Sequence, residues 1–443
     1  MAWKAVRTGC CSHPGGRLAV TPWVLATTVG LAGAMSLGLA LSGCGLSGRL
    51  SNQGVDAANG PVRIAGAASP SADPASTVPV EPGIGTTSPS ATPPALAVTS
   101  SPPGDPLASD PVRDGERVPT GTPVTIAFGG DVHFEGSVGE RLAADPRSMF
   151  GSIAQTLGRA DLAMVNLETA VTTRGTPTDK KYVFRAPPSA FNALQTAGID
   201  IATLANNHGM DYGLDGLYDT LAGARAASFP VVGIGTDDTA AYAPARVTVH
   251  GQRIAIVGAT QVIDDELMSA WTSGPGKPGL ASAKNVPRLL KAVRAARQDS
   301  DTVIVYLHWG VERQSCPTQA QQSLVPQLVA AGADVVVGAH AHVLLGGGWQ
   351  PGGAYVDYGL GNFAFYSSGN GPNTASGVLT LTVAGRAITA AEWTPARIVG
   401  GVPQPLAGTG ASAARAEWHR LRACAELAAG PPPRVPAHTG RRN

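Results

Sequence analysis

The feature that most constrains this sequence is a series of short apolar runs, most of them followed directly by polar side chains. Runs rich in β-branched residues predict strands, and helical patterns stand between them. The predicted strands are Val124–Phe128, Leu162–Val165, Ile199–Leu204, Arg253–Val257, Thr302–Leu307, Asp334–Val337 and Ala354–Tyr358. The predicted helices are Ala190–Ala197, Leu217–Ala226, Val286–Ala296 and Gln319–Ala331. This alternation predicts an α/β domain with a mainly buried sheet.

The last part of this region lacks the alternation. Gly377–Val383 and Ala387–Trp393 have no helix between them, so they predict a β-hairpin around Ala384-Gly385. The domain is therefore expected to add an antiparallel portion to its sheet. We place its limits at residues 122–429.

The polar residues after the predicted strands are carboxylates, amides and imidazoles. Five of the nine histidines of the chain lie in these loops. In open α/β sheets, ligands bind beyond the carboxyl ends of the strands, so we expect these loops to converge. The residues, in chain order, are Asp131, His133, Glu168, Asn207, His208, His308, His340 and His342.

This combination of side chains is suited to a pair of metal ions. Two divalent cations held ~3.5–4 Å apart need a bridging carboxylate and further imidazole and carboxylate ligands. The Asp-x-His and His-x-His spacings each put two side chains on the same side of an extended segment. A single Asp or His after a strand is usually a turn or helix-cap residue. Five such loops in one domain favour a shared metal centre over five separate explanations.

The order of these motifs resembles the calcineurin-like metallophosphoesterase superfamily. Within it, several strings resemble the bacterial capsule-synthesis branch, the CapA type associated with poly-γ-glutamate synthesis. The resemblance extends over roughly Pro123 to Arg397 and implies an α-β-β-α sandwich with central mixed sheets. The strings are Asn166-Leu167-Glu168, Tyr182-Val183-Phe184-Arg185-Ala186-Pro187, Asn206-Asn207-His208-Gly209-Met210-Asp211, His308-Trp309-Gly310-Val311-Glu312 and Gly361-Asn362-Phe363.

The resemblance also implies a role for each ligand. One ion would be held by Asp131, His133 and His342, and the other by Asn207, His308 and His340. Glu168 would bridge the two ions, at a place where most of the superfamily has Asp. Shells that mix imidazole with oxygen ligands suit Mn, Fe or Zn better than Ca.

A metal-dependent hydrolase follows as the expected activity. Water activated by the metal ions would attack phosphorus or a carbonyl carbon. His208 would protonate the leaving group, oriented by Asp211; alternatively, His208 only contacts the backbone at a helix N-terminus. Lys181 and Arg185 would receive an anionic substrate; alternatively, they are solvated loop charges.

The N-terminal residues 1–44 read as an export signal. Lys4, Arg7 and Arg17 precede the apolar stretch Trp23–Leu41, which ends at Leu41-Ser42-Gly43-Cys44. Small residues before a cysteine match the lipobox of bacterial lipoproteins, so Cys44 is the predicted lipidation site. The alternative is a single transmembrane anchor, because the stretch is nearly long enough to span a bilayer. Either interpretation predicts an extracytoplasmic domain on the bacterial cell membrane.

Two segments have the composition of linkers. Residues 45–121 are rich in Pro, Ser, Thr and Ala and predict a flexible tether, and residues 430–443 predict a disordered tail. Between them lie two cysteines, Cys316 and Cys424, which an exported domain would be able to pair, although the sequence does not show whether they meet.

The charge and the motifs of the chain limit the classes of partner that we expect. The formal net charge of +1 and the lack of a Lys/Arg run argue against nucleic acid. An anionic polymer or a phosphoester is the expected substrate, with membrane-bound capsule or polymer synthesis proteins as partners. Three functions remain open: a hydrolase in capsule or poly-γ-glutamate metabolism, a general extracytoplasmic phosphoesterase, and a non-catalytic polymer-binding or assembly scaffold.

Overall fold

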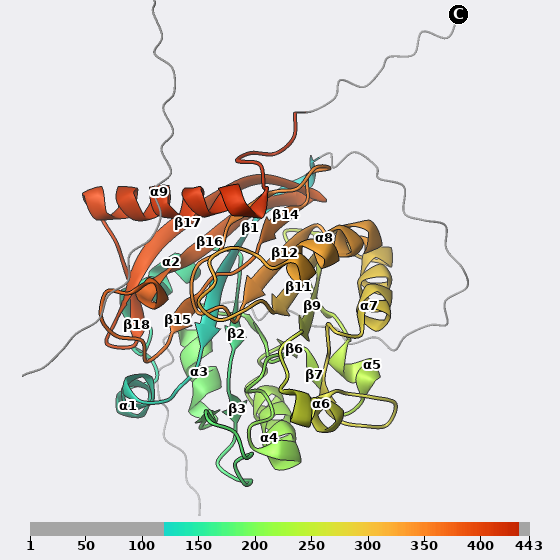
Figure 1. Ribbon diagram of the computed structural model, residues 1–443, viewed down its shortest axis with the longest axis vertical. Coiled ribbons are helices and arrows are strands. Elements are labelled where there is room, and N and C mark those ends of the chain that lie inside the picture. Colours follow the sequence, from blue (N-terminus) through green and yellow to red (C-terminus); the bar gives the residue numbers. More distant parts are fainter. Residues whose placement is uncertain (1–118, 434–443) are drawn as a thin grey trace, which may run out of the picture. The chain divides into compact units, whose positions relative to one another are not determined.

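The computed structural model describes residues 119–433, and the fold consists of two β-sheets between helices (Figure 1). The export signal, Cys44, most of the expected tether and the end of the tail lie outside these residues. The first sheet has the strand order β18-β17-β16-β1-β2-β5-β6, with β15 beside β1. Its strands are β1 (Pro119–Val132), β2 (Leu162–Leu167), β5 (Ile201–Thr203), β6 (Val231–Val232), β15 (Asn362–Ala364), β16 (Ala375–Gly385), β17 (Ala387–Val399) and β18 (Val402–Pro405).

The second sheet has the order β13-β14-β12-β11-β9-β8. Both sheets are mixed, because a parallel centre is extended by antiparallel strands at one or both edges. The strands of the second sheet are β8 (Ala245–Val249), β9 (Gln252–Thr260), β11 (Thr302–His308), β12 (Val335–Ala339), β13 (Gly347–Trp349) and β14 (Tyr355–Asp357). Two short pairs lie outside the sheets: β3 (Ala170–Val171) with β4 (Arg185–Ala186), and β7 (Ile234–Gly235) with β10 (Gly279–Leu280).

Helices cover the outer face of each sheet. Apolar side chains between the two sheets form the central layer, and two further layers lie beneath the helices. The first sheet is covered by α1 (Ser137–Ala144), α2 (Ala154–Leu157), α3 (Ser189–Thr196) and α4 (Gly213–Ala226). The second is covered by α5 (Asp238–Ala241), α7 (Val286–Gln298) and α8 (Gln319–Ala331). The expected sandwich with central mixed sheets is thus confirmed.

The predicted strands and helices are present, with shifts of a few residues at their ends. Strand β1 begins at Pro119, inside the segment expected to be tether. The hairpin is also present, with its tip at Arg386 between β16 and β17. The alternation alone does not show that the buried strands divide between two sheets, because the buried strands of both sheets have the same apolar pattern.

A bulge near the end of β1 positions the first candidate ligand. The register between β1 and β2 shifts between Phe128 and Asp131. A side chain at Gly130 would overlap the carbonyl oxygen of Gly361, so only glycine allows this close approach. The Tyr306 hydroxyl donates to the Gly129 carbonyl at 2.7 Å and joins the second sheet to the bulge.

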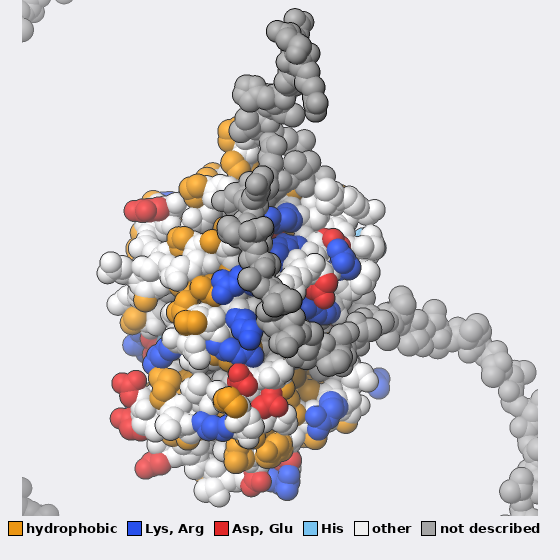
Figure 2. Space-filling model, turned by 90° about the vertical axis from the view of Figure 1, so that its right-hand side faces the viewer, with side chains coloured by type: hydrophobic (Ala, Val, Ile, Leu, Met, Phe, Trp, Pro, Cys, Tyr) orange, Lys and Arg blue, Asp and Glu red, His pale blue; other side chains and the backbone are white. Residues whose placement is uncertain are grey.

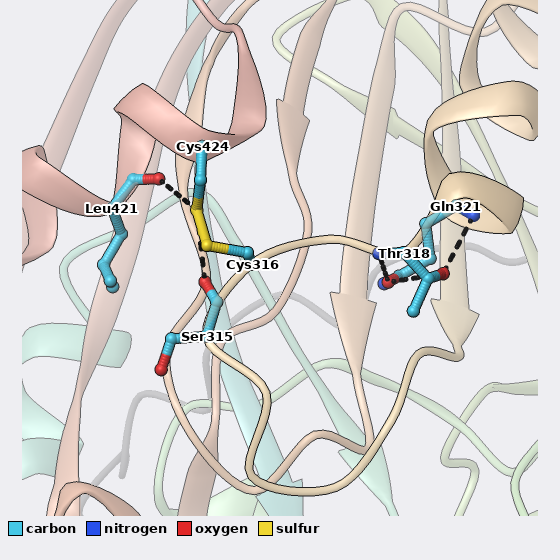
Figure 3. Close-up of a disulfide and its surroundings, with 6 residues drawn as sticks. All are labelled: Ser315, Cys316, Thr318, Gln321, Leu421 and Cys424. Atoms are coloured by element: carbon cyan, nitrogen blue, oxygen red, sulfur yellow. Dashed lines mark hydrogen bonds between the residues drawn. A yellow bond between two sulfur atoms is a disulfide. The ribbon is translucent and has the colours of Figure 1, made fainter. Parts of the chain in front are cut away.

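The C-terminal helix closes one end of the sandwich. Helix α9 (Gly408–Ala425) packs against β17 and β13, and its Trp418 ring stacks on Trp393 at 5.1 Å. A disulfide joins Cys424 of α9 to Cys316, with 5.6 Å between the Cα atoms, so the pairing that the sequence left open is present (Figure 3). It ties α9 to the loop between β11 and α8.

The visible surface carries charges of both signs. On the face shown in Figure 2, Lys and Arg side chains are interspersed with Asp and Glu, as expected from the net charge of +1. Among residues 119–433, no helix combines the length and apolar character that a membrane span requires.

A buried carboxyl group makes the stability of this domain depend on pH. One oxygen of Asp357 accepts the Gly359 N–H at 3.0 Å, and the other is buried without a partner. Burial raises the pKa of Asp357 from 3.8 to about 7. The folded state therefore binds the proton more tightly than the unfolded state. This contribution to stability is complete below pH ~4 and is lost as the pH rises to ~7.

Asp357→Asn is expected to remove this part of the pH dependence. Relative to the variant, the wild-type chain should lose at most ~4 kcal/mol of unfolding free energy between pH 4 and 8, at ~1.4 kcal/mol per pKa unit. Urea unfolding of both proteins across this range measures the difference. Parallel pH profiles of the two proteins would contradict a buried neutral Asp357.

Candidate metal centre

The loops after five strands meet at the carboxyl ends of the two sheets. Asp131 lies at the end of β1, Glu168 after β2 and Asn207 after β5. His308 ends β11, and the His340–His342 loop follows β12. Within residues 119–433, two groups of ligand atoms lie within 4.8 Å of one another: Glu168, His308 and His340, and Asp131, Glu168 and His342. Glu168 belongs to both groups, as a bridging ligand would.

In the first group, His308 lies between two oxygen ligands. Its Nε2 is 3.5 Å from Glu168 Oε1 and 2.7 Å from Asn207 Oδ1. Ligands of one ion at bond lengths near 2.1 Å are separated by about 3 Å, so these atoms are close enough to share an ion. Asn207 thus lies beside the group for which it was predicted.

In the second group, His342 lies beside Asp131 and is oriented by an amide. His342 Nδ1 is 3.3 Å from Asp131 Oδ2 and 2.8 Å from Asn362 Oδ1. The Asn362 amide nitrogen donates to Ser367 Oγ and to the Asn373 carbonyl, so its oxygen faces the imidazole. The Asn362 amide therefore fixes the orientation of this imidazole beside Asp131.

The His340–His342 loop has an unusual backbone. His340 has φ of 96° and His342 has φ of 56°, in the region that favours glycine. The His340 N–H donates to Asp131 Oδ2, and the Ala341 carbonyl accepts from the Arg313 N–H at 2.7 Å. Backbone strain of this kind persists where surrounding contacts impose it, often at functional sites.

The burial of Glu168 tests whether these residues fit a cation. Both of its carboxylate oxygens are buried and have no hydrogen-bond donor. Burial, followed by the neighbouring Asp131 carboxylate, raises the pKa of Glu168 well above its usual value. A buried carboxylate without donors is costly unless a cation compensates it. The site therefore fits divalent metal ions.

The imidazoles are also suited to metal binding. Burial lowers the pKa of His340 to about 3 and that of His308 well below its usual value, so both imidazoles are neutral at pH 7. His340 Nδ1 is buried without a partner. For His342, burial opposes the charged form, but Glu168 and Asp131 outweigh it and raise the pKa to about 10. The two carboxylates therefore attract positive charge at this position.

His208 and Asp211 form a pair beside the two groups. His208 Nδ1 is 2.6 Å from Asp211 Oδ2, and its Nε2 is 4.0 Å from Glu168 Oε1. The Phe184 ring stacks on the imidazole at 3.9 Å. The sequence predicts this contact with Asp211; proton donation to a leaving group stays a prediction. Burial lowers the pKa of His208, and the Asp211 carboxylate opposes this effect.

A match to a known protein family covers most of the described chain. Residues 125–367, more than half of the chain, match the model of the bacterial capsule synthesis protein PGA_cap. The chain belongs to the bacterial capsule synthesis protein family. This assignment confirms the CapA-type branch that the motifs resemble.

Curated relatives of the capsule synthesis family match parts of the chain. The capsule biosynthesis protein CapA of Bacillus anthracis is 34% identical over 42% of this chain and 45% of its own length. The PGA biosynthesis protein CapA of Bacillus subtilis is 30% identical over 55% of this chain and 63% of its own length. A probable polyglutamine synthesis accessory protein of Mycobacterium tuberculosis is 32% identical over 41% of this chain and 50% of its own length. The chain therefore spans about half to three-fifths of these relatives.

Solved structures resemble the chain only distantly. A phosphatase of Mycoplasma pneumoniae is 15% identical, with a TM-score of 0.41 over 62% of this chain and 94% of its own. A 5'-nucleotidase of Candida albicans is 10% identical, with a TM-score of 0.36 over 68% of this chain and 58% of its own.

His133 differs from the other predicted ligands of this capsule synthesis protein. Among the described residues, neither ligand group includes it. Its ring packs against Phe184, Phe365 and Tyr366 at 4.0–4.7 Å. Backbone N–H groups of Glu135 and Tyr366 lie 3.0 and 3.3 Å from its two ring nitrogens. These three rings form an aromatic cage around His133, and metal binding by His133 stays a prediction.

Lys181 and Arg185 are exposed at the surface. Lys181 Nζ lies 5.0 Å from the centre of the Tyr182 ring, and the Arg185 guanidinium 4.9 Å from that of Tyr212. Substrate binding by these two residues stays a prediction. The neighbouring Lys180, which no motif singled out, has a largely buried side chain and contacts both Asp211 and the Asn207 carbonyl.

Two further amides support the ligands and were also missed. Asn166 Nδ2 lies 2.8 Å from Asp131 Oδ1 and 3.1 Å from His308 Nδ1. Asn206 Nδ2 donates to Asn166 Oδ1 at 3.0 Å. Both stand within two residues of a candidate ligand, inside the strings that resemble the family. Amides at such positions are the available signal for partners that orient metal ligands.

Proposed function

We propose that this chain is an extracytoplasmic, membrane-anchored capsule synthesis protein with a two-metal hydrolytic site. The observation that carries the proposal is Glu168, which both ligand groups share and whose two buried oxygens have no hydrogen-bond donor. Anchoring rests on the Trp23–Leu41 stretch and Cys44, which favour lipidation over a transmembrane segment.

The residues of such a site would have separate roles. Asp131, Glu168 and His342 would hold one ion, and Glu168, with Asn207, His308 and His340, the other. When bound, Mn, Fe or Zn ions supply Lewis acidity and make water nucleophilic at neutral pH. His208, whose Nδ1 contacts Asp211 and whose Nε2 lies 4.0 Å from Glu168 Oε1, would protonate a leaving group.

The substrate class comes from the relatives. Their names refer to capsule and PGA biosynthesis and to polyglutamine synthesis. We therefore propose hydrolysis within capsule or poly-γ-glutamate metabolism, together with membrane-bound synthesis proteins. A parallel assay of the full chain on an aryl phosphate and on a γ-glutamyl polymer separates this function from a general phosphoesterase. Bound metal without turnover of either would favour a non-catalytic scaffold.

Metal binding is expected to stabilise the chain. A ligand that binds only the folded state adds ~2.7 kcal/mol at a free concentration 100 times its Kd. Mn²⁺ or Zn²⁺ added to EDTA-treated protein should therefore raise the thermal unfolding midpoint, and elemental analysis should find up to two ions per chain. Ca²⁺ at equal concentration is the control and should act more weakly. An unchanged midpoint with Mn²⁺, Fe²⁺ and Zn²⁺ would contradict the metal site.

A further inference from the structure

We infer that Lys180 is a positioning residue that clamps the turn carrying Asn207 and His208. The inference rests on the proposed function, because it assigns Lys180 to the same metal site. It concerns a residue that no ligand motif contains and that precedes the exposed Lys181 in the sequence.

The Lys180 ammonium joins the two ends of one turn. Its Nζ donates to the carbonyl oxygen of Asn207 and lies 2.9 Å from Asp211 Oδ1. These acceptors are four residues apart, with His208 between them. The Lys180 side chain is only 9% exposed, so protein groups rather than water occupy two of its three donors.

Each end of the clamped turn carries a group of the site. At one end, Asn207 Oδ1 lies 2.7 Å from His308 Nε2. At the other, Asp211 Oδ2 lies 2.6 Å from both His208 Nδ1 and the Phe184 N–H. A shift of either end would therefore move a candidate ligand or the candidate proton donor.

Charge compensation alone does not account for these contacts. A cation that only balanced the buried Asp211 carboxylate would need no bond to the Asn207 carbonyl. The Trp271 ring lies 5.3 Å from Nζ, and an aromatic face of this kind favours a cation in a site with little water. Lys180 thus combines a charge with a fixed direction for its donors.

Calorimetric titration of the metal-free full chain with Mn²⁺ tests the clamp. Lys180→Met keeps the length of the side chain and removes its charge and donors. It should weaken Mn²⁺ binding ~10-fold or more, the usual effect of losing a partner that orients a ligand. Lys180→Arg should recover most of the affinity, because it restores the charge and the donors. Lys291→Met, at an exposed position of α7, is the matched control and should bind as the wild type does.

A second pair of variants separates positioning from folding. Lys180→Met leaves the buried Asp211 carboxylate without its lysine partner and risks unfolding the chain. Asp211→Asn and the double variant Lys180→Met/Asp211→Asn both lack the Asp211 charge and differ in the Lys180 ammonium with its contacts, among them the bond to the Asn207 carbonyl. The clamp predicts weaker Mn²⁺ binding by the double variant. Equal affinity of this pair, or wild-type affinity of Lys180→Met, would overturn the role of Lys180 alone. A wild-type chain that binds no Mn²⁺ would overturn the proposed function and the clamp together.

Discussion

Glu168→Gln is expected to abolish binding of the metal pair and, at the same time, to stabilise the metal-free chain. The variant keeps the size of the side chain and removes the charge that both ligand groups share. Losing a residue that only orients a metal ligand lowers metal affinity ~10- to 100-fold. Loss of the shared ligand itself should lower Mn²⁺ affinity by more than this. In EDTA, the unfolding free energy should rise by about 1–3 kcal/mol, because a buried carboxylate without donors disappears.

The gain in stability should depend on pH. Burial raises the pKa of Glu168, so the wild-type carboxyl stabilises the folded state less as the pH rises above its unfolded pKa of 4.5. The difference between the variant and the wild type should therefore grow from pH 5 to pH 8. Glu168→Asp is the matched control: it keeps the charge and should retain weakened binding. A Gln variant that still holds two ions would refute the bridging role.

His208→Ala should abolish turnover while metal content persists. A positioned general acid contributes ~10²–10⁴-fold to the rate, and a loss of this size is expected for whichever substrate the wild type hydrolyses. The imidazole belongs to neither ligand group, so Mn²⁺ affinity should change little. Rate measurements at saturating metal, combined with elemental analysis, separate the two effects.

His419→Ala provides the control for this substitution. His419 lies exposed on α9 and contacts none of the candidate ligands among the described residues, so its removal should leave turnover unchanged. If the His208 variant kept wild-type turnover, proton donation would have to come from another group, and the contact with Asp211 would be structural only.

The sequence predicted which candidate ligands lie together, but it did not predict the residues that surround them. Asp131, Glu168, His308 and the His340/His342 pair were found because strand ends of an α/β sheet meet at one edge. The ligand pattern alone did not show the cage around His133, since Phe365 and Tyr366 come from a loop more than 230 residues further along the chain. Similarly, Lys180 and Lys181 look equivalent until Asp211, 31 residues away, is brought beside one of them.

The arrangement of the two sheets was beyond local pattern reading. Buried strands such as β2 and β11 are apolar throughout, so their sequences do not indicate which sheet each joins. Helix α9 was missed for a related reason. Its buried side chains include Trp418 but are few, and its Ala, Gly and Arg content does not give a clear apolar stripe.

The bond between Cys316 and Cys424 sets an order of events for this protein. Its second sulfur lies near the end of the described chain, so the loop after His308 stays untied until almost all of the domain has been made. Thiols stay reduced in a bacterial cytoplasm and oxidise outside it. For the exported protein proposed above, maturation of the loop after His308 would be completed only after secretion, which would separate synthesis of the protein from its final covalent form.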